Sequence, residues 1–292
     1  MSLIATANRI YKEDKELFKS IQKVPTIDVL GKNFNPPAGG EFAIVDEFNN
    51  ILNFCTESYQ LVPNANILLP VERKLKEANV EFSRQVNVYD NAQYHVSYFI
   101  KNHKKKVLGE LYPKLTIVNS YDGKVKFRKE FGWMRLVCLN GLTRPHGVSD
   151  IKISKHSADM DEFALAMIVR EISEQTTVFI KESKKDIERF EKLNAKEVNQ
   201  KLIAQVTKEL KLSDKIASAA EARFALETGS TKEPFTYVDL DGNLRTSAPA
   251  DKSLFTLYNA INYAIYNLNP KEDQQKKSEK DARLLEYVET LN

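Results

Sequence analysis

The hydrophobic pattern of this chain changes its period near residue 159, and this change limits the possible folds more than any other feature. Between residues 92 and 101 apolar side chains alternate with more polar ones, the apolar set being Tyr94, Val96, Tyr98 and Ile100. A period of two is typical of a half-buried strand. From Asp159 to Leu193 the apolar residues recur every three to five positions, as on a long amphipathic helix or two helices in line. We therefore predict an α+β fold: an antiparallel sheet in a strand-strand-strand-helix unit, packed by a long helix, with a helical C-terminal half.

Breaks in the pattern divide the chain into three consecutive segments. Two prolines and two glycines between residues 36 and 40 interrupt the chain. Residues 1–40 are therefore predicted to form a charged N-terminal helix and a lead-in, with the folded core beginning near Glu41. Residues 41–158 are predicted to form the sheet and one helix. Residues 159–292 are predicted to form a helical region that packs on the sheet.

Turn and helix signals place individual elements within these segments. Asn49 and Asn50 tolerate a left-handed turn, which predicts a hairpin between strands at 42–46 and 51–56. A helix is predicted from about residue 67 to 79, with Pro70 in its first turn. Residues 131–140 are expected to be a central strand. Further helices are expected over 194–210, 213–229 and 254–268, whereas the mixed-charge residues 270–283 should be exposed.

Positive charge is concentrated in the sheet segment. Residues 94–155 hold 13 Lys or Arg against 4 Asp or Glu, a local charge of +9 in a chain whose net charge is +3. Basic residues interleaved with aromatics are what a protein needs to attract phosphates and stack bases. An ordinary antiparallel sheet with lysines on its wet face accounts for the same residues. Both interpretations remain open from the composition.

A nucleic-acid site can nevertheless be specified residue by residue. The Asp122-Gly123 turn predicts a return strand that carries Lys124, Lys126 and Arg128 on one face, about 7 Å apart. The cations expected to neutralise phosphates are Lys104, Lys105, Lys106, Lys124, Lys126, Arg128 and Lys129. The aromatic side chains expected to stack bases are Phe99 and Tyr121. Arg135 lies in an apolar strand, where pairing with a buried acid or a backbone carbonyl is the stronger prediction.

The common signatures of catalysis and metal binding are missing from the sequence. Neither HExxH nor CxxC occurs, and neither does GxxxxGK[ST], GxGxxG or GxSxG. We therefore expect no catalytic residue, no metal and no cofactor, and a non-enzymatic protein. Cys55 and Cys138 are predicted to be small buried hydrophobes. A long apolar run and the apolar core of a secretion signal are also missing, which predicts a cytoplasmic protein without a membrane partner.

Four spaced segments resemble the phage- and plasmid-borne "domain of unknown function 932" family. They are Ser58–Asn64, Asn119–Gly123 with Phe131–Leu142, Ile151–Ser157 and Thr256–Tyr263. The second resembles the family's strand ending in Arg-(Val/Leu)-Val-Cys-x-Asn-(Thr/Gly)-Leu, and the last its Leu-Tyr-Asn-Ala helix. Family members usually carry a His after that helix, where this chain has Ile265, Tyr266 and Asn267, so no role of that His is carried over. The resemblance implies a mobile-element protein.

The charge pattern and the resemblance together lead to two hypotheses of function. The first is a phage or plasmid protein that binds single-stranded DNA, as a single-strand annealing recombination protein in a homo-oligomer. In architecture alone, a strand-strand-strand-helix unit with a basic sheet also resembles Rad-type, RecT and Erf annealing proteins. The second is a protein-interaction module, such as an inhibitor of a host defence enzyme, with the long helix as its oligomer or partner face. A net charge of only +3 favours this second hypothesis.

Overall fold

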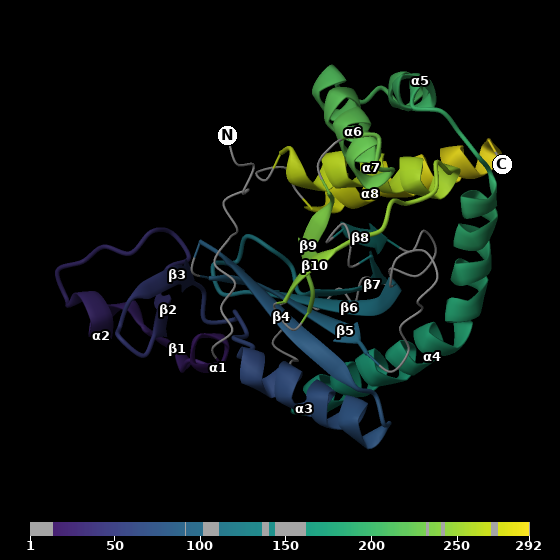
Figure 1. The fold of residues 1–292 in the computed structure, drawn as a ribbon. Helices are drawn as coiled ribbons and strands as arrows, with labels where there is room; N and C mark the ends of the chain where they lie inside the picture. The colour runs from purple at the N-terminus through teal and green to yellow at the C-terminus, as the bar shows by residue number, and fades with distance from the viewer. Residues whose placement is uncertain are drawn as a thin grey trace. The chain divides into compact units, whose positions relative to one another are not determined.

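The fold divides into two compact units, each built from three stretches of the chain. The structure is a computed structural model and describes residues 14–90, 92–101, 111–135, 140–143, 162–231, 234–240, 243–269 and 274–291 (Figure 1). Unit 1 comprises Met1–Tyr98, Leu115–Glu130 and Ser149–Val178. Unit 2 comprises Phe99–Lys114, Phe131–Val148 and Phe179–Asn292. Each unit is therefore discontinuous in the sequence, whereas three consecutive segments were predicted.

A small sheet with the order β1-β2-β3 belongs to unit 1. After the short helix α1 (Asp14–Leu17), its elements are β1 (Ile21–Pro25), α2 (Thr26–Leu30), β2 (Phe42–Asp46) and β3 (Ile51–Cys55). The predicted hairpin of β2 and β3 is confirmed, with Asn49 at a left-handed φ of 61°. The folded core begins earlier than Glu41, because β1 pairs antiparallel with β2 from Ile21 to Pro25.

Helix α3 (Asn64–Glu77) packs one apolar face into unit 1. Ile67, Leu68, Val71 and Leu75 are buried. The helix begins three residues before the predicted start, so Pro70 lies inside it rather than in its first turn. The reason is a distant contact: the backbone N–H of Asn64 donates to the hydroxyl of Tyr121 at 2.8 Å, which satisfies a helix-end donor that no local residue caps.

A larger sheet has the order β4-β5-β6-β7-β8. Its strands are β4 (Phe82–Tyr89), β5 (Gln93–Ile100), β6 (Leu111–Ser120), β7 (Arg128–Arg135) and β8 (Asn140–Thr143), and the long helix α4 (Glu162–Ala195) follows them. The predicted alternation in β5 is confirmed from Gln93 to Val96, whereas all residues from Ser97 to Ile100 are buried. The strand predicted over 131–140 corresponds to β7, which lies between β6 and β8. The α+β architecture is thus the predicted one.

Helix α4 packs against β7 in each unit separately. In unit 1 the Lys129 ammonium reaches the Glu171 carboxylate. In unit 2 the ring of Phe179 lies 5.3 Å from that of Phe131, and the Trp133 indole N–H donates to Asp186 at 3.1 Å. The prediction of a long helix packed on the sheet is therefore confirmed.

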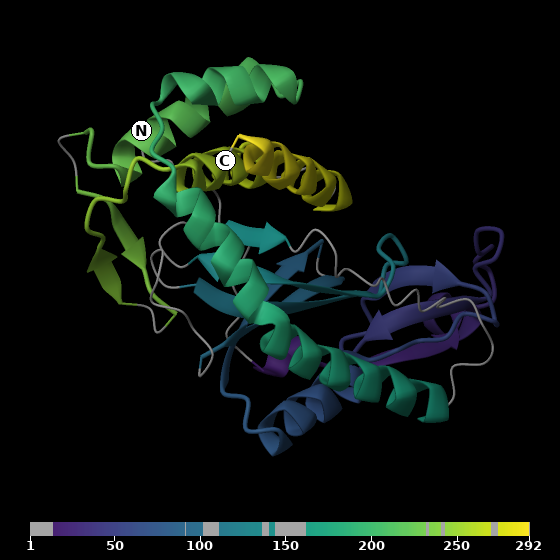
Figure 2. The same ribbon diagram turned by 90° about the vertical axis from the view of Figure 1, so that its right-hand side faces the viewer.

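The C-terminal part of unit 2 is helical apart from one small hairpin (Figure 2). Its elements are α5 (Lys201–Glu209), α6 (Asp214–Glu227), β9 (Thr236–Val238), β10 (Leu244–Thr246), α7 (Leu254–Asn267) and α8 (Gln274–Thr290). Helix α7 contacts α6, α8 and β8. Helix α5 begins at Lys201 rather than near Asn194, because the chain around Glu197 pairs instead with the chain around Ser253.

Helix α8 buries one face, so the prediction that residues 270–283 are exposed is corrected at Lys277 and Asp281 only. Leu284, Leu285 and Val288 are buried in unit 2. Of the charged residues before them, Lys277 and Asp281 are buried, whereas Lys276, Glu279 and Arg283 are exposed. The Asp281 carboxylate accepts hydrogen bonds from the Tyr258 hydroxyl and the Asn262 amide, both at 2.7 Å. This mixed-charge segment therefore combines solvated side chains with two charged ones that are buried against polar partners.

Candidate nucleic-acid interface

The lysines of the Asp122-Gly123 turn lie in a loop and not on a strand. Strand β6 ends at Ser120 and β7 begins at Arg128, so residues 121–127 connect them. Gly123 has a left-handed φ of 71°, and the Asp122 carboxylate accepts the backbone N–H of Lys124 at 3.0 Å. This side chain to backbone bond stabilises an irregular turn. The predicted row of three cations on one strand face is therefore wrong.

Two exposed ammonium groups remain in this loop. Lys126 is exposed. The side chain of Lys124 is 65% exposed, and its ammonium lies 3.6 Å from the carboxylates of Asp90 and Asp122. The pair with Asp90 joins two exposed side chains and is weak in water, whereas the Asp122 side chain is only 7% exposed. The described part of the loop therefore presents two cations to solvent, of which one has acidic neighbours.

The two basic residues that follow are engaged within unit 1. Arg128 is half-buried, and its guanidinium pairs with Glu130 at 2.8 Å. The Lys129 side chain is completely buried, and its ammonium contacts the Glu171 carboxylate at 2.8 Å. Burial lowers the pKa of Lys129, although the bond to Glu171 opposes that shift. The prediction that Lys129 faces solvent as a phosphate ligand is wrong, because α4 covers it.

Both aromatic residues predicted to stack bases are buried, each with 1% exposure. In unit 2, Phe99 packs with Tyr112 and Met134 in an apolar cluster. In unit 1, the ring of Tyr121 lies 5.3 Å from that of Tyr94, and its hydroxyl accepts the backbone N–H of Asn64 at the start of α3. Burial raises the pKa of Tyr121. The expected exposure of these rings is therefore wrong, because Phe99 packs inside unit 2 and Tyr121 inside unit 1.

Much of the basic window lies outside the described residues. Six of its 13 cations do so, namely Lys104, Lys105, Lys106, Arg144, Lys152 and Lys155. Within the described residues the basic side chains do not form the continuous row predicted. The proposed contact set is thereby reduced to Lys124 and Lys126, together with the three lysines at 104–106.

Arg135 behaves as the sequence predicts, because it pairs with a buried acid in unit 2. Its guanidinium donates to one oxygen of the Glu227 carboxylate at 2.6 Å, and Arg223 donates to the other at 2.6 Å. The side chains of Arg135, Glu227 and Arg223 are 4%, 1% and 10% exposed. The Arg223 guanidinium also lies 4.3 Å from the ring centres of both Phe235 and Tyr263. Sequence reasoning missed Arg223, although its spacing of four from Glu227 in a predicted helix was the available signal.

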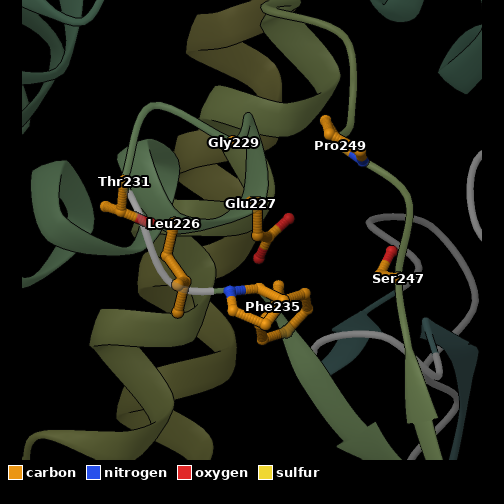
Figure 3. A pocket seen from close by; sticks show the side chains of 8 residues that line it. Leu226, Glu227, Gly229, Thr231, Phe235, Ser247 and Pro249 are labelled. Atoms are coloured by element: carbon orange, nitrogen blue, oxygen red, sulfur yellow. The ribbon is translucent and has the colours of Figure 1, made fainter.

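A pocket of about 260 Å³ lies beside this ion triad (Figure 3). Its walls come from the end of α6 and from the two segments flanking the β9-β10 hairpin, and they include Leu226, Phe235 and Pro249. The pocket is smaller than the roughly 300–1000 Å³ usual for a small-molecule site. Its acidic lining residue, Glu227, is already held by two guanidinium groups. We therefore interpret Glu227 as a structural anchor of unit 2.

The described part of the chain offers neither a metal-binding cluster nor a membrane-spanning helix. No three His, Cys, Asp or Glu side chains gather there in a way that could hold a metal ion. Among those same residues, no helix combines the length and apolar character needed to span a membrane.

The comparison with family models decides which proteins this chain is related to. The model of the family "Domain of unknown function (DUF932)" matches residues 51–286. The chain belongs to this family. The match to DUF932 runs from β3 into α8 and so includes parts of both units. No curated protein and no solved structure matched the chain.

The residues that carry the DUF932 resemblance form buried polar contacts where the structure describes them. Asn119 donates to the Asn64 side chain at 2.9 Å and to the Val62 carbonyl at 3.0 Å, so two of the resembling segments meet in unit 1. In unit 2, Arg135 binds Glu227 and the Tyr258 hydroxyl donates to Asp281. Buried polar groups without partners are costly, so pairs of this kind specify how segments meet. These contacts give the residues that carry the resemblance a structural role in the fold.

Proposed function

We propose that this DUF932 protein binds single-stranded DNA without covalent chemistry, through lysines of its basic window and not through the sheet face. The observation that supports the proposal is the segregation of charge, with +9 in residues 94–155 of a chain whose net charge is +3. Lys124 and Lys126 add to it because their ammonium groups are exposed in one loop. Lys104, Lys105 and Lys106 complete the proposed set.

Binding of this kind is electrostatic, so its strength should depend on salt in a countable way. Each phosphate neutralised on a single strand contributes about 0.7 to the slope of log affinity against log salt concentration. Five lysines therefore predict a slope of about −3.5. The Asp90 neighbour of Lys124 does not prevent this, since an exposed pair contributes roughly 0–1 kcal/mol and can exchange for a phosphate.

The test is a fluorescence-polarisation titration of a labelled oligonucleotide at several salt concentrations. The variant Lys124→Gln/Lys126→Gln removes two contacts, so we expect the slope to fall by about 1.4. The control is Lys74→Gln/Lys76→Gln on α3, which has the same spacing and charge change at two exposed lysines of unit 1. Absence of binding at low salt would overturn the proposal. An equal effect of both variants would remove this loop from it.

Strand annealing is the activity that we propose for the bound state. Cations that follow a backbone without reading bases would hold two strands while complementary bases pair. The expected result is that the protein accelerates pairing of two labelled complementary oligonucleotides, and that Lys124→Gln/Lys126→Gln slows this more than the α3 control. If DNA binds and annealing is no faster than without protein, the annealing role is excluded while the binding role stands.

A second candidate is a protein-interaction module, which exposed apolar side chains favour. Phe48 in the β2–β3 turn is 70% exposed, Ile27 on α2 is 51% exposed and Phe163 on α4 is 71% exposed. Large apolar side chains on a surface often mark contact sites. The oligonucleotide titration separates the two candidates, because a chain that binds no DNA at low salt retains only the second.

A further inference from the structure

The solvent-exposed face of the first half of α4 has an unusual arrangement of side chains. Phe163 is 71% exposed, Met167 47% and Val178 50%. Between them, Arg170 and Glu174 form an ion pair at 2.7 Å, with side chains 69% and 62% exposed. We call these five residues the α4 stripe. All five lie in unit 1.

The α4 stripe cannot be buried by rotating the helix in place. The opposite side of the same turns holds Val169, Ile172 and Thr176, which are buried in the fold. Residues three, four or seven apart share one helix face, and the stripe follows this spacing along about three turns or more. The stripe is therefore a continuous outward face with apolar side chains at both ends and a cation followed by an anion in the middle.

This order of side chains is complementary to itself. When two copies of a helix run antiparallel about a two-fold axis at residue 172, Arg170 of each copy faces Glu174 of the other. Met167 then lies opposite residue 177 of the other copy. Val178 of that copy is one residue further on, about 1.5 Å along the helix axis. A parallel arrangement would instead place Arg170 against its own copy. Opposed like charges disfavour that arrangement.

We propose that the α4 stripe binds the α4 stripe of a second copy of this chain, antiparallel, through an isologous contact. Two Arg-Glu pairs would form across the interface in addition to the pair within each helix, and apolar side chains would flank them. A two-fold interface of this kind uses the same patch on both copies. The inference does not depend on DNA binding, since it uses residues outside the proposed DNA contacts.

Charge exchange tests this arrangement with the full-length chain and without DNA. In Arg170→Glu both central positions are acidic, and in Glu174→Arg both are basic. Each variant alone should lose self-association by at least about tenfold in light scattering coupled to size exclusion, because like charges meet twice across the axis. An equimolar mixture of the two variants should associate again, and so should the chain carrying both exchanges.

Further variants separate the interface from effects on folding. Lys74→Glu on α3 makes a matched charge change beside Glu77 in another exposed pair, and should leave self-association unchanged. Phe163→Ser/Met167→Ser should weaken it without touching a charge. Recovery on mixing cannot come from misfolded chains, so it supports the contact directly. A wild-type chain that stays monomeric at high concentration, or single variants whose mixture does not associate, would overturn the inference.

The same samples distinguish this inference from the proposed function. If the single variants are monomeric and still bind the oligonucleotide with the wild-type salt slope, both proposals stand and are independent. If self-association follows the charge-exchange pattern while no variant binds DNA, the α4 stripe stands and the DNA proposal fails. If DNA binds and the charge exchanges have no effect on mass, the α4 stripe fails alone.

Discussion

Replacing Glu227 by Ala should destabilise unit 2 strongly, because it leaves two guanidinium groups without their shared carboxylate. The side chains of Glu227, Arg135 and Arg223 are 1%, 4% and 10% exposed, so water replaces the lost partner poorly. Removing one partner from a buried ion pair costs about 3–5 kcal/mol. The exposed pair of Arg170 and Glu174 offers the comparison, since an i,i+4 pair in solvent contributes only about 0.2–0.5 kcal/mol.

Trp133 gives this prediction a local assay. It is the one tryptophan of the chain, it is buried in unit 2, and its indole donates to Asp186. Urea unfolding followed by its fluorescence therefore reports on unit 2. With a urea slope of about 2–3 kcal/mol per molar, Glu227→Ala should lower the unfolding midpoint by more than about 1 M.

Two variants control the interpretation of that shift. Glu174→Ala should move the midpoint by no more than about 0.3 M. Glu227→Gln keeps the shape and one acceptor but loses the charge, so it should lie between the wild type and Glu227→Ala. A Glu227→Ala midpoint within the range of Glu174→Ala would refute the reasoning, because the triad would then contribute no more than a surface pair.

Three further predictions concern unit 1. Lys129→Met should leave oligonucleotide affinity within twofold and lower thermal stability by no more than about 1 kcal/mol, because the Glu171 carboxylate that loses its partner is 44% exposed and can be hydrated; a large drop in affinity would show that Lys129 contacts DNA. Tyr121→Phe leaves the first N–H of α3 unpaired, so thermal unfolding by circular dichroism should show a loss of about 1–3 kcal/mol, with DNA binding retained. Burial alone would raise the pKa of Asp46, but hydrogen bonds from the β2–β3 turn outweigh it and hold the pKa below the ordinary 3.8. Its charged form therefore stabilises the fold above that pH, and the melting-temperature gap between Asp46→Asn and wild type should shrink as the pH falls below about 4; a constant gap would contradict this.

Features encoded in neighbouring residues could be predicted from the sequence. The β2–β3 hairpin follows from its Asn pair, and α4 follows from its apolar spacing. Helix α6 ends before Gly229, whose φ of 66° is left-handed as a helix end requires. The pairing of Arg135 could be predicted in kind, because an arginine in an apolar strand needs an acid or a carbonyl.

Features that depend on distant contacts could not be predicted in this way. Alternation in a strand shows which side chains share a face, but not which element covers that face. Lys129 was assigned to solvent because nothing near it in sequence indicates α4 above it. Phe99 and Tyr121 were assigned to stacking for the same reason, since their partners lie elsewhere in the chain. The candidate site is therefore smaller than predicted, because packing within each unit covers these three residues.

The way in which the chain crosses between its two units has a practical consequence. The backbone leaves unit 1 at residue 98, returns at 115, leaves again at 130, returns at 149 and leaves finally after 178. A fragment that begins between residues 115 and 178, or ends between residues 99 and 148, would therefore deprive both units of strands or helix turns. Deletion mapping across this region would report unfolding rather than the location of an activity, so only point substitutions in the intact polypeptide can assign a role to either half.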